Sequence, residues 1–283
     1  MRWYPRTFLL LLRRSVLAAL DDGCLSVAKG AAYSALLSFC PVLASAATIL
    51  VEVRAQFVSR VIVRVLSEIV PPGSEDLVEQ QFRVSGARPL SLLIVAGAIS
   101  LWAASGVVKS LIEGFQAAYR VPRSRGFLHQ SGLAMALVLG LAVPIIGASV
   151  LILFGNQVET AVLSWMKVGP IWTPFTGVWE LLGRVARYAV AFVTAAVATA
   201  FLYYFGPYRK QRWRFVWPGA VLATVLFMLA TAGFAWYVRN VAHYNVMYGS
   251  VGVVIALLVW MYLIAAIAMI GCEFNAEYER SKR

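Results

Sequence analysis

Long stretches of apolar residues without a single charged side chain dominate the pattern along this chain. Six of them, each 20 to 29 residues long, contain no Asp, Glu, Lys or Arg. A run of about 18 apolar residues is long enough for one α-helix to cross the hydrocarbon core of a bilayer. A spanning segment must also satisfy its own backbone hydrogen bonds, which a helix does. The pattern predicts six spanning helices at residues 30–51, 89–108, 131–158, 188–208, 215–238 and 244–272.

The other segments predict no separate domain, so the whole chain is expected to be a single integral membrane domain. Residues 1–29 join short apolar runs to charged pairs, which predicts a cytoplasmic helix on the membrane surface. Residues 54–69 place apolar side chains at helical spacing and predict a second amphipathic helix. Residues 159–181 hold two prolines and three tryptophans, a composition that favours the membrane interface. After the six-helix region 30–272, residues 273–283 are expected to form a cytoplasmic tail.

Composition leads to the same fold class, an all-α membrane protein with a bundle of six transmembrane helices and amphipathic surface helices. Of the 283 residues, 61% are hydrophobic and only 13% are charged. A soluble domain carries about 25% charged residues. Since this chain lacks the charge to cover a soluble exterior, its natural solvent is partly hydrocarbon.

Basic residues are distributed unevenly about the six predicted spans. The formal net charge is +12, and 16 of the 25 Lys and Arg residues lie on the side that holds both termini, against 9 on the other. Because cytoplasmic loops are enriched in Lys and Arg, both termini are predicted to be cytoplasmic. In a soluble protein this charge would suggest nucleic-acid binding. Here the basic residues are expected to contact anionic lipid headgroups, with no nucleic-acid partner.

No arrangement of residues in the sequence is typical of catalysis or of a cofactor site. The chain has no HExxH, no phosphate-binding P-loop and no GxSxG motif, and its three cysteines form no CxxC pair. Its 13 acidic residues are scattered, mostly in predicted surface loops. We therefore expect no catalytic residue, no bound metal and no cofactor.

Two pairs of charged residues near the ends of predicted spans are candidates for a binding site. Arg184 and Arg187 lie one turn apart where the fourth span begins. They either anchor the helix at lipid phosphates or bind an anionic headgroup or substrate. Lys109 and Glu113 are spaced i, i+4 at the cytoplasmic end of the second span. They form either a helix ion pair or the polar lining of a cavity.

Glu273 and Glu277 share one helical face directly after the last predicted span. The simplest interpretation is a solvated helix end, in which the basic residues that follow complement the helix dipole. The alternative is a cluster with Glu113 and Glu279 near the cytoplasmic face, which a nuclease would need to hold a metal or move protons.

Three stretches of the chain carry recognisable motifs. Residues 30–41 contain Tyr and Leu-Leu-Ser before a Pro, and residues 217–220 read Trp-Pro-Gly-Ala after a basic loop. Residues 248–277 open with Tyr-Gly-Ser and end with Gly-Cys-Glu-Phe-Asn-Ala-Glu. In these stretches, and along nearly its whole length, the chain resembles the YihY/BrkB family of bacterial inner-membrane proteins. The residues that match the family's motifs are Tyr33, Pro41, Pro218, Gly219, Tyr248, Gly249, Gly271, Glu273, Asn275 and Glu277.

This resemblance implies a bacterial inner-membrane protein with six spanning helices and both ends in the cytoplasm. Members of the family were long labelled ribonuclease BN, a label now regarded as mistaken, and others are linked to serum resistance and to envelope or lipopolysaccharide phenotypes. We expect a transporter or translocator of an anionic lipid or solute. Its expected partners are membrane lipids, with an anionic phospholipid or a lipopolysaccharide precursor as the candidate, and an oligomer is compatible with the sequence. The alternatives are a non-catalytic scaffold for envelope machinery and, in third place, a ribonuclease.

Overall fold

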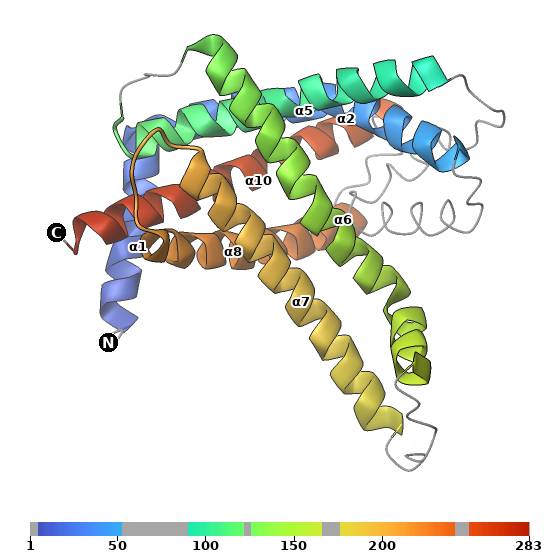
Figure 1. Cartoon of the computed structure of the whole chain (residues 1–283). Helices are drawn as coiled ribbons and strands as arrows, with labels where there is room; N and C mark the ends of the chain where they lie inside the picture. The colour runs from blue at the N-terminus through green and yellow to red at the C-terminus, as the bar shows by residue number, and fades with distance from the viewer. Residues whose placement is uncertain (1–4, 53–89, 122–125, 166–175, 241–248, 283) are drawn as a thin grey trace.

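The computed structural model describes residues 5–52, 90–121, 126–165, 176–240 and 249–282. Within these ranges all regular secondary structure is helical (Figure 1). The helices are α1 (Pro5–Asp21), α2 (Cys24–Glu52), α5 (Leu90–Ala118), α6 (Phe127–Trp165), α7 (Thr176–Phe205), α8 (Trp213–Asn240) and α10 (Gly249–Arg280). All except α1 are long and apolar enough to cross a membrane, which makes 6 candidate spans. The prediction of an all-α membrane protein with six spanning helices is confirmed.

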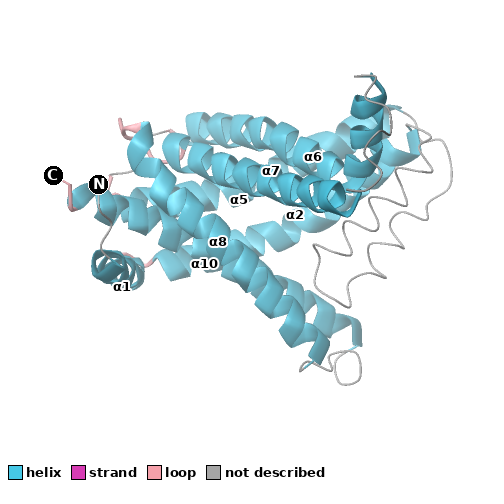
Figure 2. Ribbon diagram, turned by 90° about the horizontal axis from the view of Figure 1, so that it is seen from below, coloured by secondary structure: helices cyan, strands magenta, loops and turns pink. Residues whose placement is uncertain are grey.

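Helix α10 occupies the centre of the bundle. It packs against α8, α2, α1 and α5, while α2 and α5 pack against each other along their length. Helices α6 and α7 form an outer pair, in which α6 contacts α5 and α7 contacts α8. Figure 2 shows this pair beside α5, with α8 running alongside α10. In Figure 1, α1 lies across the ends of the spanning helices rather than parallel to them.

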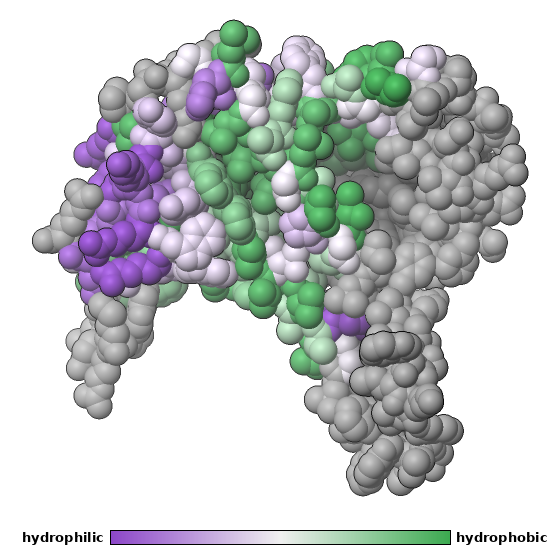
Figure 3. Space-filling view, viewed as in Figure 1, coloured by the Kyte–Doolittle hydropathy of each residue, from purple (hydrophilic) through white to green (hydrophobic). Residues whose placement is uncertain are grey.

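One end of the bundle, which we call the polar end, carries both chain termini (Figure 1). On the face shown in Figure 3, hydrophilic residues gather at this end, whereas apolar residues cover most of the described surface between it and the other end. Large apolar side chains such as Trp102 and Val143 are exposed along the spans, as a lipid-facing surface requires. Helix ends and turns from the whole chain form the polar end, namely residues 20–24, 113–121, 126–131, 205–214 and 273–282.

Several helix boundaries differ from the predicted ones because a charged residue does not by itself end a helix. Helix α2 begins at Cys24, inside the segment expected to be a surface helix, and Lys29 continues it with an exposed side chain. Helix α10 runs on to Arg280, through most of the expected tail. Helices α6 and α7 extend into the segment expected at the interface, as far as Trp165 and from Thr176 onward. The amphipathic helix predicted at 54–69 lies outside the described residues.

Candidate functional site

Two left-handed turns place charged residues side by side at the polar end. Gly23 joins α1 to α2 with φ of +70°, a conformation that glycine adopts without steric cost. At the end of α5, Arg120 has φ of +52°, and its N–H donates to the carbonyl of Ala117 at 2.8 Å, as in a Schellman cap. These turns bring Asp22 and Arg120 together, with 3.5 Å between Oδ1 and Nε.

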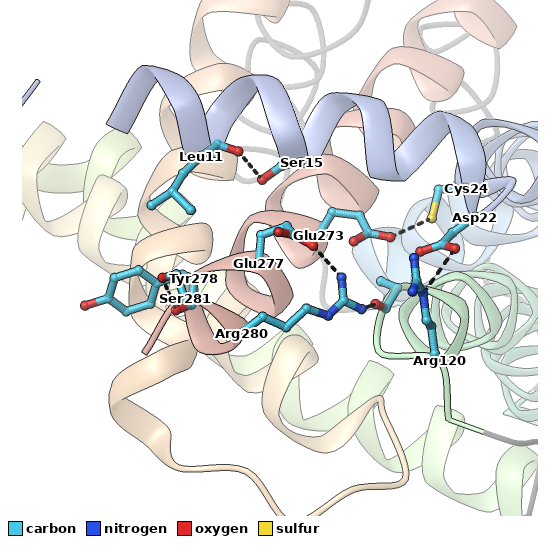
Figure 4. A network of polar contacts seen from close by, with 11 residues as sticks. Leu11, Ser15, Asp22, Cys24, Arg120, Glu273, Glu277, Tyr278, Arg280 and Ser281 are labelled. Atoms are coloured by element: carbon cyan, nitrogen blue, oxygen red, sulfur yellow. Dashed lines mark hydrogen bonds and ion pairs between the residues drawn. The ribbon is translucent and has the colours of Figure 1, made fainter. Parts of the chain in front are cut away.

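Glu273 is the most deeply buried acidic residue that the structure describes. Its side chain on α10 is 0% exposed and points toward Cys24 and Asp22 from the α1–α2 turn (Figure 4). The Cys24 thiol donates to Glu273 Oε1, with 3.6 Å between sulfur and oxygen. Glu273 Oε2 and Asp22 Oδ2 are both buried without a hydrogen-bond partner in the described part of the chain. A thiol is a weak donor, so this carboxyl group is poorly compensated for its burial.

Arg280 closes the other side of this group of residues. One guanidinium nitrogen donates to Glu277 Oε1, and the other donates to the carbonyl of Ala118 at 2.9 Å (Figure 4). Arg280 therefore caps the last turn of α5 and is committed to Glu277 rather than to Glu273. The solvated helix end expected from the sequence is wrong for Glu273, which the packing of α1 and α2 removes from water.

A second polar group lies nearby, where the α7–α8 connection meets α10. Arg209 forms an ion pair with Glu279 and lies over the ring of Tyr119, 4.9 Å from its centroid. Burial raises the pKa of the Tyr119 hydroxyl well above its usual range, so this group stays protonated and neutral. Gln211 donates to the carbonyl of Tyr204 at 3.0 Å and so covers the end of α7. These contacts tie the basic loop after α7 to the end of α10.

Asn275 holds α8 against α10 at a point where both backbones come close. Its Oδ1 accepts from the Gly219 N–H at 2.6 Å, and its Nδ2 donates to the Val216 carbonyl at 2.8 Å. A Cβ atom added to Gly219 would lie 2.0 Å from the Gly271 carbonyl oxygen, so this crossing requires glycine. Pro218 lies inside α8 and lacks an N–H, so the side chain from α10 bonds to α8 where the helix ladder is interrupted.

The motif residues identified in the sequence divide between these two places. Gly219, Gly271 and Asn275 build the α8–α10 crossing, where Pro218 also lies, whereas Glu273 and Glu277 belong to the group at the α1–α2 turn and Arg280. The remaining positions are spread out: Tyr33 is exposed on α2, Pro41 lies inside α2, Gly249 begins α10, and Tyr248 lies outside the described residues.

The four candidate binding residues do not join the buried group around Glu273. The Arg184 side chain lies outside the description, and Arg187 is half-buried on α7, away from the polar end. Lys109 Nζ donates to Ser131 Oγ on α6 at 3.4 Å, and Glu113 is half-buried on α5. Whether these residues bind an anionic ligand stays a prediction.

Sequence reasoning missed Asp22 and Cys24 as neighbours of Glu273. The signal that could have found them is the Asp-Asp-Gly-Cys sequence, since an aspartate and a cysteine flank a glycine suited to a turn. Among the described residues, no group of three His, Cys, Asp or Glu side chains could hold a metal ion. The cluster around Glu273 can hold or release a proton, or attract a cation, through its unpartnered oxygens.

Known proteins resemble this chain over most of its length. The family model of the virulence factor BrkB matches residues 16–283. A ribonuclease-like protein of Bacillus subtilis, YfkH, is 28% identical over 223 residues, which cover 77% of this chain and 78% of the relative. A UPF0761 membrane protein of Alteromonas mediterranea is 30% identical over 253 residues, covering 86% of this chain and 79% of the relative.

Another relative, a UPF0761 membrane protein of Alkalilimnicola ehrlichii, is 29% identical over 260 residues. The match covers 90% of this chain but 55% of that relative, so this chain spans about half of its length. No solved structure matches the chain.

Proposed function

This chain belongs to the BrkB family of membrane proteins, and from that premise we propose that it is a transporter in a bacterial inner membrane that moves an anionic lipid or solute. The observation that carries this proposal is Glu273, an ionisable side chain that is 0% exposed within the candidate span Val251–Arg280. Ionisable residues inside spanning helices are costly, and they commonly mark ion or substrate pathways. A purely structural scaffold has no need of one.

The charge distribution supports an anionic substrate. The net charge is +12, and the polar end carries a dense basic loop with Arg209, Lys210, Arg212 and Arg214. Such a surface attracts anionic headgroups and solutes. In this proposal the polar end faces the cytoplasm, in agreement with the rule that cytoplasmic loops are enriched in Lys and Arg.

Arg184 and Arg187 supply the proposed contact at the other end of the bundle. Two guanidinium groups one helical turn apart can engage one phosphate or carboxylate, and the planar fork of Arg suits that geometry. In the proposal, Lys109 and Glu113 contact the same substrate nearer the polar end, where α5 meets α6.

A flux assay tests the proposal directly. The purified protein is reconstituted into vesicles that contain a fluorescent phosphatidylglycerol or a fluorescent phosphatidylcholine, and movement between leaflets is followed by quenching from outside. We expect faster movement of the anionic lipid than in protein-free vesicles. The double variant Arg184→Gln, Arg187→Gln should lower that rate, whereas Arg239→Gln, an exposed arginine at the end of α8, serves as the matched control.

Rates equal to those of protein-free vesicles, for the anionic lipid and for a panel of anionic solutes, contradict transport and favour the scaffold. Orientation is tested separately by cysteine labelling at Gln211. Labelling of that position from the periplasm would contradict cytoplasmic termini.

We further propose that the protein is not a nuclease. A metal-dependent nuclease needs side chains that hold its metal, and a metal-holding group of three side chains is absent from the residues that the structure describes. The assay is RNA cleavage by detergent-purified protein with added Mg²⁺ or Mn²⁺. Turnover that disappears in Glu273→Gln or Glu277→Gln would overturn this part of the proposal.

A further inference from the structure

The two oxygens of Glu273 have unequal surroundings. Oε1 accepts from the Cys24 thiol, but Oε2 is buried and has no partner among the described residues. Figure 4 shows this carboxyl group aimed at the space next to the α1–α2 turn, where the Asp22 carboxyl group also lies. Within the described ranges, Asp22 Oδ2 is buried and unpartnered as well. Two acceptors without a donor are thus brought together from opposite ends of the chain.

The charged groups around Glu273 do not neutralise it. From the α1–α2 turn, Asp22 brings a second carboxyl group close to Glu273, and Cys24 contributes only its thiol. On α10 itself, Glu277 is a further carboxylate one turn away, and Arg280 donates to Glu277. At the end of α5, Arg120 pairs with Asp22, and its side chain is 66% exposed. An ionised Glu273 would be a buried charge without a dedicated partner, which is costly.

Protonation of Glu273 removes this buried charge and needs fewer neighbouring groups than any other ligand. A metal ion would need more ligands than this place offers, and the described residues contain no group that could hold one. A proton needs one acceptor oxygen, and two neighbouring carboxylates hold one readily because both cannot be charged at low cost. We infer that Asp22 and Glu273 form a proton-binding site, in which one proton from the aqueous phase resides on Glu273 Oε2.

Asp22 connects this site to water. Its side chain is 17% exposed and is paired with the largely exposed Arg120, so Asp22 lies between the surface of the polar end and Glu273. The proton enters from water through the Asp22 carboxylate and passes to Glu273 Oε2, and net proton movement in a transport cycle requires its release on the opposite side of the membrane. Resting on the proposed function, this site couples transport to a proton gradient.

Infrared spectroscopy tests the proton itself, without any transport. Difference spectra of wild type against Glu273→Gln at neutral pH should contain the carbonyl stretch of a protonated carboxylic acid, shifted in heavy water. The band should persist in Glu277→Gln, a glutamate one turn away that accepts from Arg280. A wild-type spectrum identical to that of Glu273→Gln in this region overturns the site.

A second variant keeps the test decisive if Glu273→Gln fails to fold. Asp22→Asn removes the neighbouring negative charge but leaves Glu273 in place. The pH titration of the carboxylic acid band should then move to lower pH, because the charged form of Glu273 is no longer opposed by Asp22. A midpoint equal to that of the wild type contradicts a shared site.

Coupling is tested in vesicles with an imposed pH gradient. With one proton per substrate, a gradient of one pH unit can support about tenfold accumulation of the substrate. Glu273→Gln should abolish this response. Transport that is indifferent to the gradient overturns the coupling while leaving the proposed function intact. Absence of any wild-type transport overturns the proposed function and the coupling together, and the infrared result still decides the site.

Discussion

Asn275 and Glu273 lie two positions apart on the same helix, and both are 0% exposed, but their surroundings differ. Asn275 faces α8, where both polar atoms of its amide bond to backbone groups. Glu273 faces the α1–α2 turn, where one oxygen has a thiol donor and the other has no described partner. Residues two apart on a helix point to nearly opposite sides. One helix thus carries a fully bonded polar contact and an incompletely bonded one.

The difference separates a buried polar residue that stabilises the fold from one whose burial lowers its stability. A buried amide with every bond made stabilises a contact, whereas a buried carboxyl group with an unused oxygen lowers stability. Proteins tend to retain such destabilising groups at functional sites. On this ground we infer a structural role for the α8–α10 crossing, and we propose that the Glu273 group has the functional one.

The largest expected effect is at the crossing itself. In Gly219→Ala the new Cβ would lie 2.0 Å from the Gly271 carbonyl oxygen, so α8 and α10 must separate. We expect a loss of about 3 kcal/mol or more in the free energy of unfolding, measured by thermal or denaturant unfolding in detergent. Gly233→Ala on the same helix is the control. Nothing lies within 4 Å of its Cβ, and alanine should stabilise the helix by up to about 1 kcal/mol. Equal effects at the two glycines would contradict a close crossing.

The next effect concerns the amide that spans the crossing. Asn275→Ala removes the bonds to Gly219 and Val216 and should reduce the free energy of unfolding by about 2 kcal/mol. Its control is Asn240→Ala, where an exposed amide donates to the Trp236 carbonyl within α8. That change should stay within about 0.5 kcal/mol. If Asn275→Ala leaves the free energy of unfolding unchanged, Asn275 does not stabilise the crossing and its contrast with Glu273 fails.

Glu273→Gln should have a smaller effect of the opposite sign. The amide has nearly the same shape as the acid and cannot ionise, so the free energy of unfolding at neutral pH should stay unchanged or rise by up to about 1 kcal/mol. The response of transport to a pH gradient should nevertheless be lost. A destabilisation as large as that of Asn275→Ala would show that Glu273 stabilises the fold, which contradicts the contrast between the two residues.

The smallest effect is expected for Arg120→Gln. Its ion pair with Asp22 is made by a side chain that is 66% exposed, so its loss should cost less than about 1 kcal/mol. High salt should reduce the wild-type stability by a similar small amount through screening. A larger loss would show that Arg120, rather than a proton, compensates the buried carboxylates.

The six spanning helices could be predicted from the sequence because each span in hydrocarbon needs a run of about 20 mostly apolar residues, and such a run is visible in the sequence. The helix ends could not be predicted in the same way. The pattern placed the last boundary at Cys272, whereas α10 continues through Glu273 to Arg280. Charge ends a span only where the residue meets lipid, and here neighbouring helices surround it.

The candidate site was less accessible from the sequence. Arg184 and Arg187 stood out because charges near a membrane are rare, but the motif residue Glu273 was interpreted as a solvated surface group. Its burial depends on Cys24, which is 249 positions away in the chain. Periodicity and spacing describe neighbours along one helix, and they carry no information about a contact of that range.

The same separation has a consequence for biogenesis. When the spanning helices leave the ribosome in order, α1 and the start of α2 are made first and wait for α10, the last helix to arrive. Until then we expect Asp22 and Cys24 to be open to water, and Phe8 lacks the ring of Phe274, whose centroid lies 5.6 Å away in the folded protein. Contacts between residues so far apart in the chain form slowly, and therefore late. Closure of the first helix onto the last is therefore expected to be the final step of folding, and nascent chains that lack the end of α10 should expose Cys24 to alkylation.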